Sequence, residues 1–220
     1  MDKTIVAIIQ ARMSSSRLPG KVLKPLAGKP ILWHIVDRCK HSRLVSDIVV
    51  ATSKERTDDE ISEFCESYKI NCHRGDLNNV LKRYLDILKK NKAKYFIRIT
   101  GDSPLICPEY IDKQIQAISY HKGDFVWDIN MAPILFGQSA QSMESILEIS
   151  RKTDDPDDLE HVGSRYLSEN PNQFKIIGIK SPEIYKKFDM RFSVDEENDY
   201  EFMSIIYDQL YQGNPISLSD

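Results

Sequence analysis

The sequence has few cysteines and no long apolar run, which argues against a disulfide-rich protein, a zinc protein and a membrane-spanning protein. Its four cysteines form no CxxC pair, which favours reduced structural thiols over a disulfide framework or a zinc site. The longest apolar runs hold about five residues, whereas a membrane-spanning helix needs roughly 20. Asp2 is acidic and no long apolar region follows it. We therefore expect no signal peptide, no membrane insertion and a cytoplasmic location.

The chain also lacks an excess of positive charge. It carries 30 Lys and Arg residues against 33 Asp and Glu residues, for a net charge of −3, which argues against a basic surface for nucleic acid. No GxSxG, HExxH or GxxxxGK(S/T) motif occurs, and the five histidines show no metal-ligand spacing. A chain of 220 residues can bury one sizeable core. We therefore expect a single domain, residues 1–220, without a nucleic-acid partner.

Apolar strand-like runs alternate with amphipathic helix-like segments through the first half of the chain. Strands are predicted at residues 5–9, 48–51, 71–73, 95–99 and 125–129. Helices are predicted at residues 30–40, 78–90 and 108–119, with a further helix that starts in a capping box from Thr57 to Glu60. This order predicts an α/β fold in which helices cover both faces of a mostly parallel sheet.

The pattern weakens in the second half. Residues 131–141 are neutral and partly apolar, and we interpret them as an excursion from the sheet, either a hairpin or a partner-facing loop. The pattern predicts helices at 142–151, 157–168 and 198–210, and late strands at 174–179 and 190–194.

The loop at residues 10–21 (Gln-Ala-Arg-Met-Ser-Ser-Ser-Arg-Leu-Pro-Gly-Lys) directly follows the first predicted strand. Ligands of open α/β sheets bind at the carboxyl ends of strands. Arg12 and Arg17 offer planar forks for phosphate, and Lys21 offers a point charge. We interpret the segment as a triphosphate-binding loop; the alternative is a solvated, charged turn.

Two aspartates follow later predicted strands. Asp102 lies in a Gly-Asp-Ser-Pro turn, and Asp195 follows the predicted strand at 190–194. Mg²⁺ usually takes one or two protein carboxylates together with phosphate and water oxygens. We therefore predict a magnesium site at Asp102 and Asp195, with a turn-forming role as the alternative for Asp102. Asp199 could instead begin the last helix.

Other polar residues follow the second and third predicted strands. Thr52 and Ser53 permit close approach of a ligand, although a plain turn explains them equally well. Arg74 is a candidate for contact with a base or phosphate. For Asp76 we favour the N-terminal cap of the helix predicted at 78–90.

Residues 7–23 and 26–30 closely resemble the opening of cytidylyltransferases that make CMP-activated acidic sugars, including the acylneuraminate and 3-deoxy-manno-octulosonate enzymes. Residues 74–76, 80–84, 98–104 and 193–195 fit, in order, the spore coat polysaccharide biosynthesis protein F branch. The resemblance implies a three-layer α/β/α, Rossmann-like fold of the nucleotide-diphospho-sugar transferase type, with a mixed, mainly parallel sheet. It also implies a homodimer, with the region around 130–170 a candidate for dimerisation or acceptor binding.

The resemblance further implies roles for particular residues. The hydroxyl of an acidic sugar attacks the α-phosphorus of CTP and pyrophosphate leaves, with Arg12, Lys21 and Asp102 in catalysis and Mg²⁺ as cofactor. The matching positions are Ala11, Arg12, Ser16, Arg17 and Lys21 on the CTP-binding loop, Thr52, Ser53 and Arg74 near the nucleoside, and Asp102 and Asp195 as the metal ligands.

Two alternative functions stay open at this point. A glycosyltransferase of the same fold would use a nucleotide-sugar, but its usual DxD motif has only Asp155-Pro-Asp157 to match it, in an acidic stretch between helices. A non-catalytic nucleotide-binding subunit of a polysaccharide cluster is the second alternative. Its support is the mostly neutral segment 136–144, where the spore coat relatives carry acidic residues.

Overall fold

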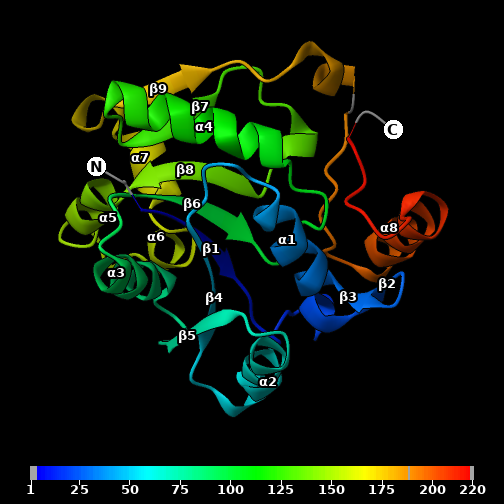
Figure 1. The fold of residues 1–220 in the computed structure, drawn as a ribbon. Coiled ribbons are helices and arrows are strands. Elements are labelled where there is room, and N and C mark those ends of the chain that lie inside the picture. The colour runs from blue at the N-terminus through cyan, green and yellow to red at the C-terminus, as the bar shows by residue number, and fades with distance from the viewer. Residues whose placement is uncertain (1–3, 188, 219–220) are drawn as a thin grey trace.

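The computed structural model describes residues 4–187 and 189–218, and these form one mixed sheet between two layers of helices (Figure 1). The strands are β1 Ile5–Gln10, β2 Pro25–Leu26, β3 Lys29–Pro30, β4 Asp47–Ser53, β5 Asn71–Gly75, β6 Tyr95–Thr100, β7 Phe125–Asp128, β8 Gln138–Ser142 and β9 Ile176–Ile179. The α-helices are α1 Ile31–Lys40, α2 Asp59–Ser67, α3 Val80–Asn91, α4 Pro108–His121, α5 Met143–Ile149, α6 Pro156–Glu160, α7 Ser164–Glu169 and α8 Glu197–Leu210. Short 3-10 turns lie at Lys21–Leu23, Arg56–Asp58, Pro133–Leu135, Pro171–Gln173 and Glu183–Lys187.

The main sheet has seven strands in the order β5-β4-β1-β6-β8-β7-β9. Strand β8 runs antiparallel to β6 and β7, whereas the other pairings in this sheet are parallel. Strands β2 and β3 form a separate hairpin, beside which α8 lies. The predicted α/β/α architecture with a mixed, mainly parallel sheet is confirmed.

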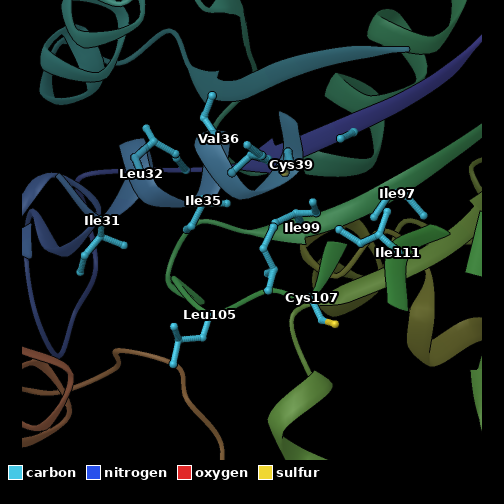
Figure 2. Close-up of a cluster of buried hydrophobic side chains, with 14 of the residues drawn as sticks. Ile31, Leu32, Ile35, Val36, Cys39, Ile97, Ile99, Leu105, Cys107 and Ile111 are labelled. Atoms are coloured by element: carbon cyan, nitrogen blue, oxygen red, sulfur yellow. The ribbon is translucent and has the colours of Figure 1, made fainter. Parts of the chain in front are cut away.

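Strand β1 divides the core into its two halves. Ile5, Ala7 and Ile9 face one cluster, and Val6 and Ile8 face the other, because side chains alternate along a strand. Helices α1, α2, α4 and α8 supply the first cluster, and α3, α5 and α7 supply the second. Figure 2 shows the first cluster, where one face of α1 packs over β6 and the start of α4. No helix in the described part of the chain is both long and apolar enough to cross a bilayer.

The interpretation of residues 131–141 as an excursion is wrong for their second half. Residues 138–142 form β8, which lies inside the sheet. The segment reads Gln-Ser-Ala-Gln-Ser and has no β-branched or aromatic residue, so its strand conformation comes from its neighbours and not from propensity. Its buried Gln138 and Gln141 find backbone partners, since Gln138 accepts from the Cys107 amide and Gln141 donates to the Val162 carbonyl.

Four further local predictions are wrong. The Thr57–Glu60 capping box is absent, because Thr57 lies in a 3-10 turn and α2 begins at Asp59. The single helix predicted at 157–168 is two helices, broken at Val162 and Gly163, which both have positive φ.

The residues predicted as a strand at 190–194 form no regular secondary structure and lie outside the sheet. Asp76 does not cap α3, since the side chain of Asn79 caps it by accepting from Lys82. Asp76 instead accepts from the amides of Asn78 and Asn79, which folds the turn that precedes the helix.

His34 of α1 packs against the aromatic side chains at the end of α8. Its ring centroid lies 4.5 Å from that of Tyr207 and 5.0 Å from that of Tyr211. Its Nε2 lies 2.8 Å from the Leu26 carbonyl oxygen. Because a carbonyl oxygen only accepts, Nε2 carries a proton, and the neutral ring can make this hydrogen bond. Burial lowers the pKa of His34, and this outweighs the opposite effect of the Leu26 hydrogen bond.

This arrangement predicts a pH-dependent stability. The folded chain resists protonation of His34, whereas the unfolded chain takes up a proton near the ordinary pKa of 6.5. Stability is therefore lost as the pH falls below about 6.5, by no more than about 1.4 kcal/mol per pH unit. Urea unfolding at pH 7.5, 6.5 and 5.5 should show a steeper loss for the parent than for His34→Gln. Equal changes of the free energy of unfolding with pH in the two proteins would contradict this role. Burial also lowers the pKa of His73, but His73 is present in both proteins, so its contribution cancels.

Candidate functional site

A cleft of about 390 Å³ lies at the carboxyl ends of β1 and β6. This is the edge at which open α/β sheets bind their ligands. Its lining combines cations, carboxylates and hydroxyls from segments that are far apart in the chain: Gln10, Ala11, Arg12, Ser15, Ser16, Arg17, Lys21, Val22, Arg98, Thr100, Gly101, Asp102, Glu160, His161 and Asp195. Most of the predicted site residues therefore lie in one place.

The loop that follows β1 is folded by its own backbone. The carbonyl of Met13 accepts from the amides of Ser15 and Gly20, both at 2.9 Å. Gly20 has a φ of 71°, a conformation that glycine adopts without the steric cost paid by other residues. The turn ends the loop and starts the 3-10 turn Lys21–Leu23, which buries Lys21 beneath the cleft.

Asp58 anchors this loop to the sheet. Its buried carboxylate accepts from the Met13 amide at 2.7 Å, and it also accepts from the amide and hydroxyl of Ser53 at the end of β4. Asp58 therefore fixes the loop against β4, a role that the sequence pattern did not indicate.

The ammonium of Lys21 joins the two predicted metal-binding carboxylates. Its Nζ lies 2.8 Å from Asp102 Oδ2 and 3.0 Å from Asp195 Oδ1. Asp102 follows β6 and Asp195 precedes α8, 93 residues later by their numbers. The cleft thus brings together the residues predicted for phosphate and for metal, although the predicted strand before Asp195 does not form.

Backbone contacts hold Asp195 in place. The Val194 amide donates to the Asp102 carbonyl at 2.8 Å, and the Asp195 amide donates to Asp199 Oδ2 at 2.9 Å. Asp199 and Glu196 also form the capping box of α8. Burial opposes ionisation of Asp195, but the hydrogen bond and charge of Lys21, helped by the charge of Arg17, outweigh it and lower the pKa of Asp195.

The two arginines of the loop also pair with carboxylates. Arg12 makes two contacts with Glu160 at the end of α6, at 3.1 and 3.3 Å. Arg17 lies 3.0 Å from Asp195 and 3.5 Å from Glu196. These guanidinium groups are about half exposed, so each pair contributes little to stability and can open when an anionic ligand offers better partners.

The turn after β6 needs a glycine at position 101. A Cβ added there would lie 2.6 Å from the Gln10 carbonyl oxygen, closer than real Cβ atoms approach. The Gly101 amide donates to that same oxygen at 2.9 Å. Gly101 therefore lets the two strand ends meet and brings Asp102 beside the loop.

The donor set fits a magnesium ion better than a transition metal. Among the described residues, no group of three or more His, Cys, Asp or Glu side chains could hold a metal ion by itself. Asp102 and Asp195 are two carboxylates that converge on one cation. Mg²⁺ is commonly held by one or two carboxylates plus phosphate oxygens, so the pair fits a metal that binds together with a nucleotide.

Three predicted nucleoside contacts lie away from the cleft lining. Thr52 and Ser53 are fully buried in β4. Arg74 donates to the carbonyls of Ser53 and Glu55 and lies 2.7 Å from Asp59. Their contact with a nucleoside stays a prediction. Ser53 and Arg74 already have partners in the described contacts, whereas the buried hydroxyl of Thr52 has no hydrogen-bond partner among the described residues.

The cleft also contains residues that the sequence pattern did not single out. Glu160 and His161 come from α6 and the residue after it, and only the fold brings them to the site. Arg98 and Thr100 belong to β6. A charged residue inside an otherwise apolar strand was the available signal for Arg98.

Comparison with known proteins identifies the family of this chain. A family model described as cytidylyltransferase matches residues 6–217. Spore coat polysaccharide biosynthesis protein SpsF of Bacillus subtilis is 30% identical over 98% of this chain and 91% of its own. The 3-deoxy-manno-octulosonate cytidylyltransferase of Geobacter sulfurreducens is 35% identical over 52% of this chain and 45% of its own.

A solved cytidylyltransferase from Leptospira borgpetersenii superposes with a TM-score of 0.87 at 26% identity, covering 96% of this chain and 89% of its own. The match of the family model over almost the whole chain, together with relatives of similar length, establishes the family. The chain belongs to the cytidylyltransferases, a family of nucleotidyltransferase enzymes.

Proposed function

We propose that the enzyme uses CTP and Mg²⁺ to activate an acidic sugar as its CMP derivative, with release of pyrophosphate, for the synthesis of a surface polysaccharide or glycan. The observation that carries this proposal is the ammonium of Lys21 between Asp102 and Asp195, in a cleft flanked by Arg12 and Arg17. The choice of CTP and of an acidic sugar is supported by the family and by the similarity to a 3-deoxy-manno-octulosonate cytidylyltransferase.

The reaction would be a displacement at phosphorus. The oxygen of the sugar hydroxyl forms a bond to the α-phosphorus of CTP, and the hydroxyl proton passes to solvent. The bond between the α-phosphorus and the oxygen that bridges to the β-phosphorus breaks, and pyrophosphate leaves with that electron pair. Arg12, Arg17 and Lys21 would offset the charge that builds on the leaving group. Ala11 and Ser16 lie on the same loop and line the cleft, where they would contact the phosphates.

Asp102 and Asp195 would hold the magnesium ion, which when bound neutralises charge on the phosphate oxygens. The same two carboxylates keep Lys21 in place within the free protein. Lys21 would turn toward the phosphates as CTP enters. The chain would thus exchange an internal ion pair for contacts with the nucleotide.

A glycosyltransferase is the weaker alternative. Asp155 and Asp157, which match the DxD spacing, lie at the start of α6, where Asp155 caps the helix by accepting from the Asp157 amide. Neither residue lines the cleft. The homodimer and the cytoplasmic location stay predictions from the resemblance and the composition.

Loss of charge at the phosphate site tests the assignment. We expect Lys21→Ala and Asp102→Asn each to slow pyrophosphate release from CTP by about 10²- to 10³-fold, because each removes an electrostatic contact that strengthens in the transition state. The assay should offer each of the four nucleoside triphosphates with a panel of keto-acid sugars. Lys24→Ala is the matched control, since Lys24 pairs with Glu197 outside the cleft.

Parent rates in both variants would refute the assignment of this cleft. A parent enzyme that binds a nucleotide-sugar in preference to a free triphosphate would favour the glycosyltransferase. Tight CTP binding without turnover of any sugar would favour a non-catalytic subunit.

Removal of the second carboxylate tests the metal site. We expect Asp195→Asn to raise the Mg²⁺ concentration for half-maximal pyrophosphate release by about tenfold or more, because one of two anionic ligands is lost. Calorimetric titration of Mn²⁺ into the CTP complex should show the same weakening. Glu196→Gln is the control, since it removes a neighbouring negative charge that pairs with Arg17 but does not line the cleft. If both variants raised the required Mg²⁺ concentration equally, Asp195 would act only through its negative charge and not as a ligand of the metal.

A further inference from the structure

A second cavity, of about 300 Å³, adjoins the nucleotide cleft where β7 and β8 separate. The two strands pair at Phe125 and Gln141, and the Ser142 amide donates to the Asp124 carbonyl next to that pair. Toward the ligand edge they diverge, and the cavity lies between Trp127 on β7 and Ser139 on β8. We call this space the split cavity.

The base of the split is sealed by a side chain from α4. Gln114 accepts from the Ala140 amide at 2.9 Å and donates to the Gln138 carbonyl at 3.4 Å. Its side chain therefore makes the hydrogen bonds to the backbone of β8 that β7 would make if the two strands stayed paired. The upper part is left open. The split cavity is therefore a stable feature of the sheet, since its exposed strand edge already has hydrogen-bond partners.

Arg98 lines both the split cavity and the nucleotide cleft. Its Nε donates to Gln10 Oε1 at 3.0 Å, and the buried hydroxyl of Tyr84 donates to the same oxygen at 3.4 Å. The guanidinium is thus held at one nitrogen. In the described contacts its two terminal nitrogens have no hydrogen bond or ion pair, whereas Arg12 and Arg17 each pair with carboxylates.

The other charged residue of the split cavity is not available to a ligand. Asp128 accepts from the backbone amides of Asn130, Ala132 and Ser181 at 3.0 to 3.4 Å. These bonds use the carboxylate to shape the surrounding turns. The buried Nε2 of Gln138, in contrast, is a donor without a partner among the described residues, and Gln138 lines the same cavity. The free polar groups here are donors, which suits an anionic, oxygen-rich ligand.

Part of the wall is apolar and open to solvent. Trp127, Met131 and Phe136 are 41%, 50% and 37% exposed, and all three line the split cavity. Aromatic and apolar walls with a few placed polar groups are typical of small-molecule sites, and a volume near 300 Å³ lies at the lower end of their range. The cavity suits a single sugar that has an apolar side.

We propose that the split cavity holds the acceptor and that Arg98 binds its carboxylate. This inference rests on the proposed function. Arg98 presents two free nitrogens, which match the two oxygens of a carboxylate. In a 2-keto acid sugar the anomeric carbon bears both the carboxylate and the reacting hydroxyl. A carboxylate at the junction of the two cavities therefore directs that hydroxyl toward the nucleotide cleft.

The test compares acids with their neutral analogues. The probes are 3-deoxy-manno-octulosonate and N-acetylneuraminate, each with its C1 carboxamide, in which the charge is lost and the shape kept. We expect Arg98→Met to lower kcat/KM for the acid by about 10- to 100-fold, the range for a charge-assisted hydrogen-bonded pair. The rate with the amide and the KM for CTP should not change. Arg98→Lys should restore part of the preference for the acid.

Arg191→Met is the matched control. Arg191 lies 4.5 Å from the centroid of the Phe136 ring but does not line the split cavity. The same loss of positive charge nearby should leave the preference for acid over amide unchanged. Thermal unfolding of each variant separates a loss of fold from a loss of binding.

A separate binding measurement uses the fluorescence of Trp127. In a Trp33→Phe background, Trp127 is the remaining tryptophan, and its emission should change saturably when the acid is added. We expect Arg98→Met to weaken this response by the same factor as kcat/KM. Binding of CTP is measured separately by calorimetry, and its turnover by pyrophosphate release.

The outcomes separate the two proposals. An unchanged preference for acid over amide in Arg98→Met, or a rise in the KM for CTP alone, would overturn the role of Arg98. Turnover of an acid that causes no response of Trp127 would overturn the split cavity as the acceptor site. CTP binding without turnover of any sugar would overturn the proposed function and not the cavity alone. A parent that binds no CTP would also overturn the proposed function.

Discussion

The shared ion pair of Lys21 with Asp102 and Asp195 is the constraint on which the site depends. A buried ammonium is costly unless carboxylates surround it. The loop after β1 buries Lys21, so two distant segments must approach to meet it. One is the turn after β6, which Gly101 permits, and the other is the extended chain before α8. The amino-terminal loop, the middle of the sheet and the last helix therefore converge on a single nitrogen atom.

Most of the fold could be predicted from the sequence because the first half follows simple periodicities. The apolar strands of this half contain mostly β-branched residues and the helices have clear apolar faces, so local pattern and final structure agree. Strand β8 could not be predicted, since its small polar residues carry no strand signal and its conformation depends on β6 and Gln114. The segment 190–194 resembles a strand in composition but pairs with no strand of either described sheet.

The candidate site was predictable where chemistry lies in one loop or directly after a strand. Arg12, Arg17, Lys21 and Asp102 are of this kind, and they meet in the cleft. Asp195 was identified through a strand that does not form; its position instead comes from the Val194 backbone contact and the start of α8. Glu160 comes from a helix that the sequence pattern did not separate from α7. Such residues depend on how segments pack, which no local pattern records.

The sparse pairing of β7 with β8 has a consequence for how this enzyme can change. The ribbon of β7 and β9 joins the rest of the sheet through one ladder position, while the phosphate-binding loop and both site aspartates belong to other segments. Exposed positions of the ribbon and its adjoining turns, such as Trp127 and Met131, can therefore change with little effect on the nucleotide half, whereas Phe125 and Val126 are buried in the same core clusters as β1. Natural selection or protein engineering can therefore alter the surface of the β7–β9 ribbon while the residues of the nucleotide cleft stay unchanged.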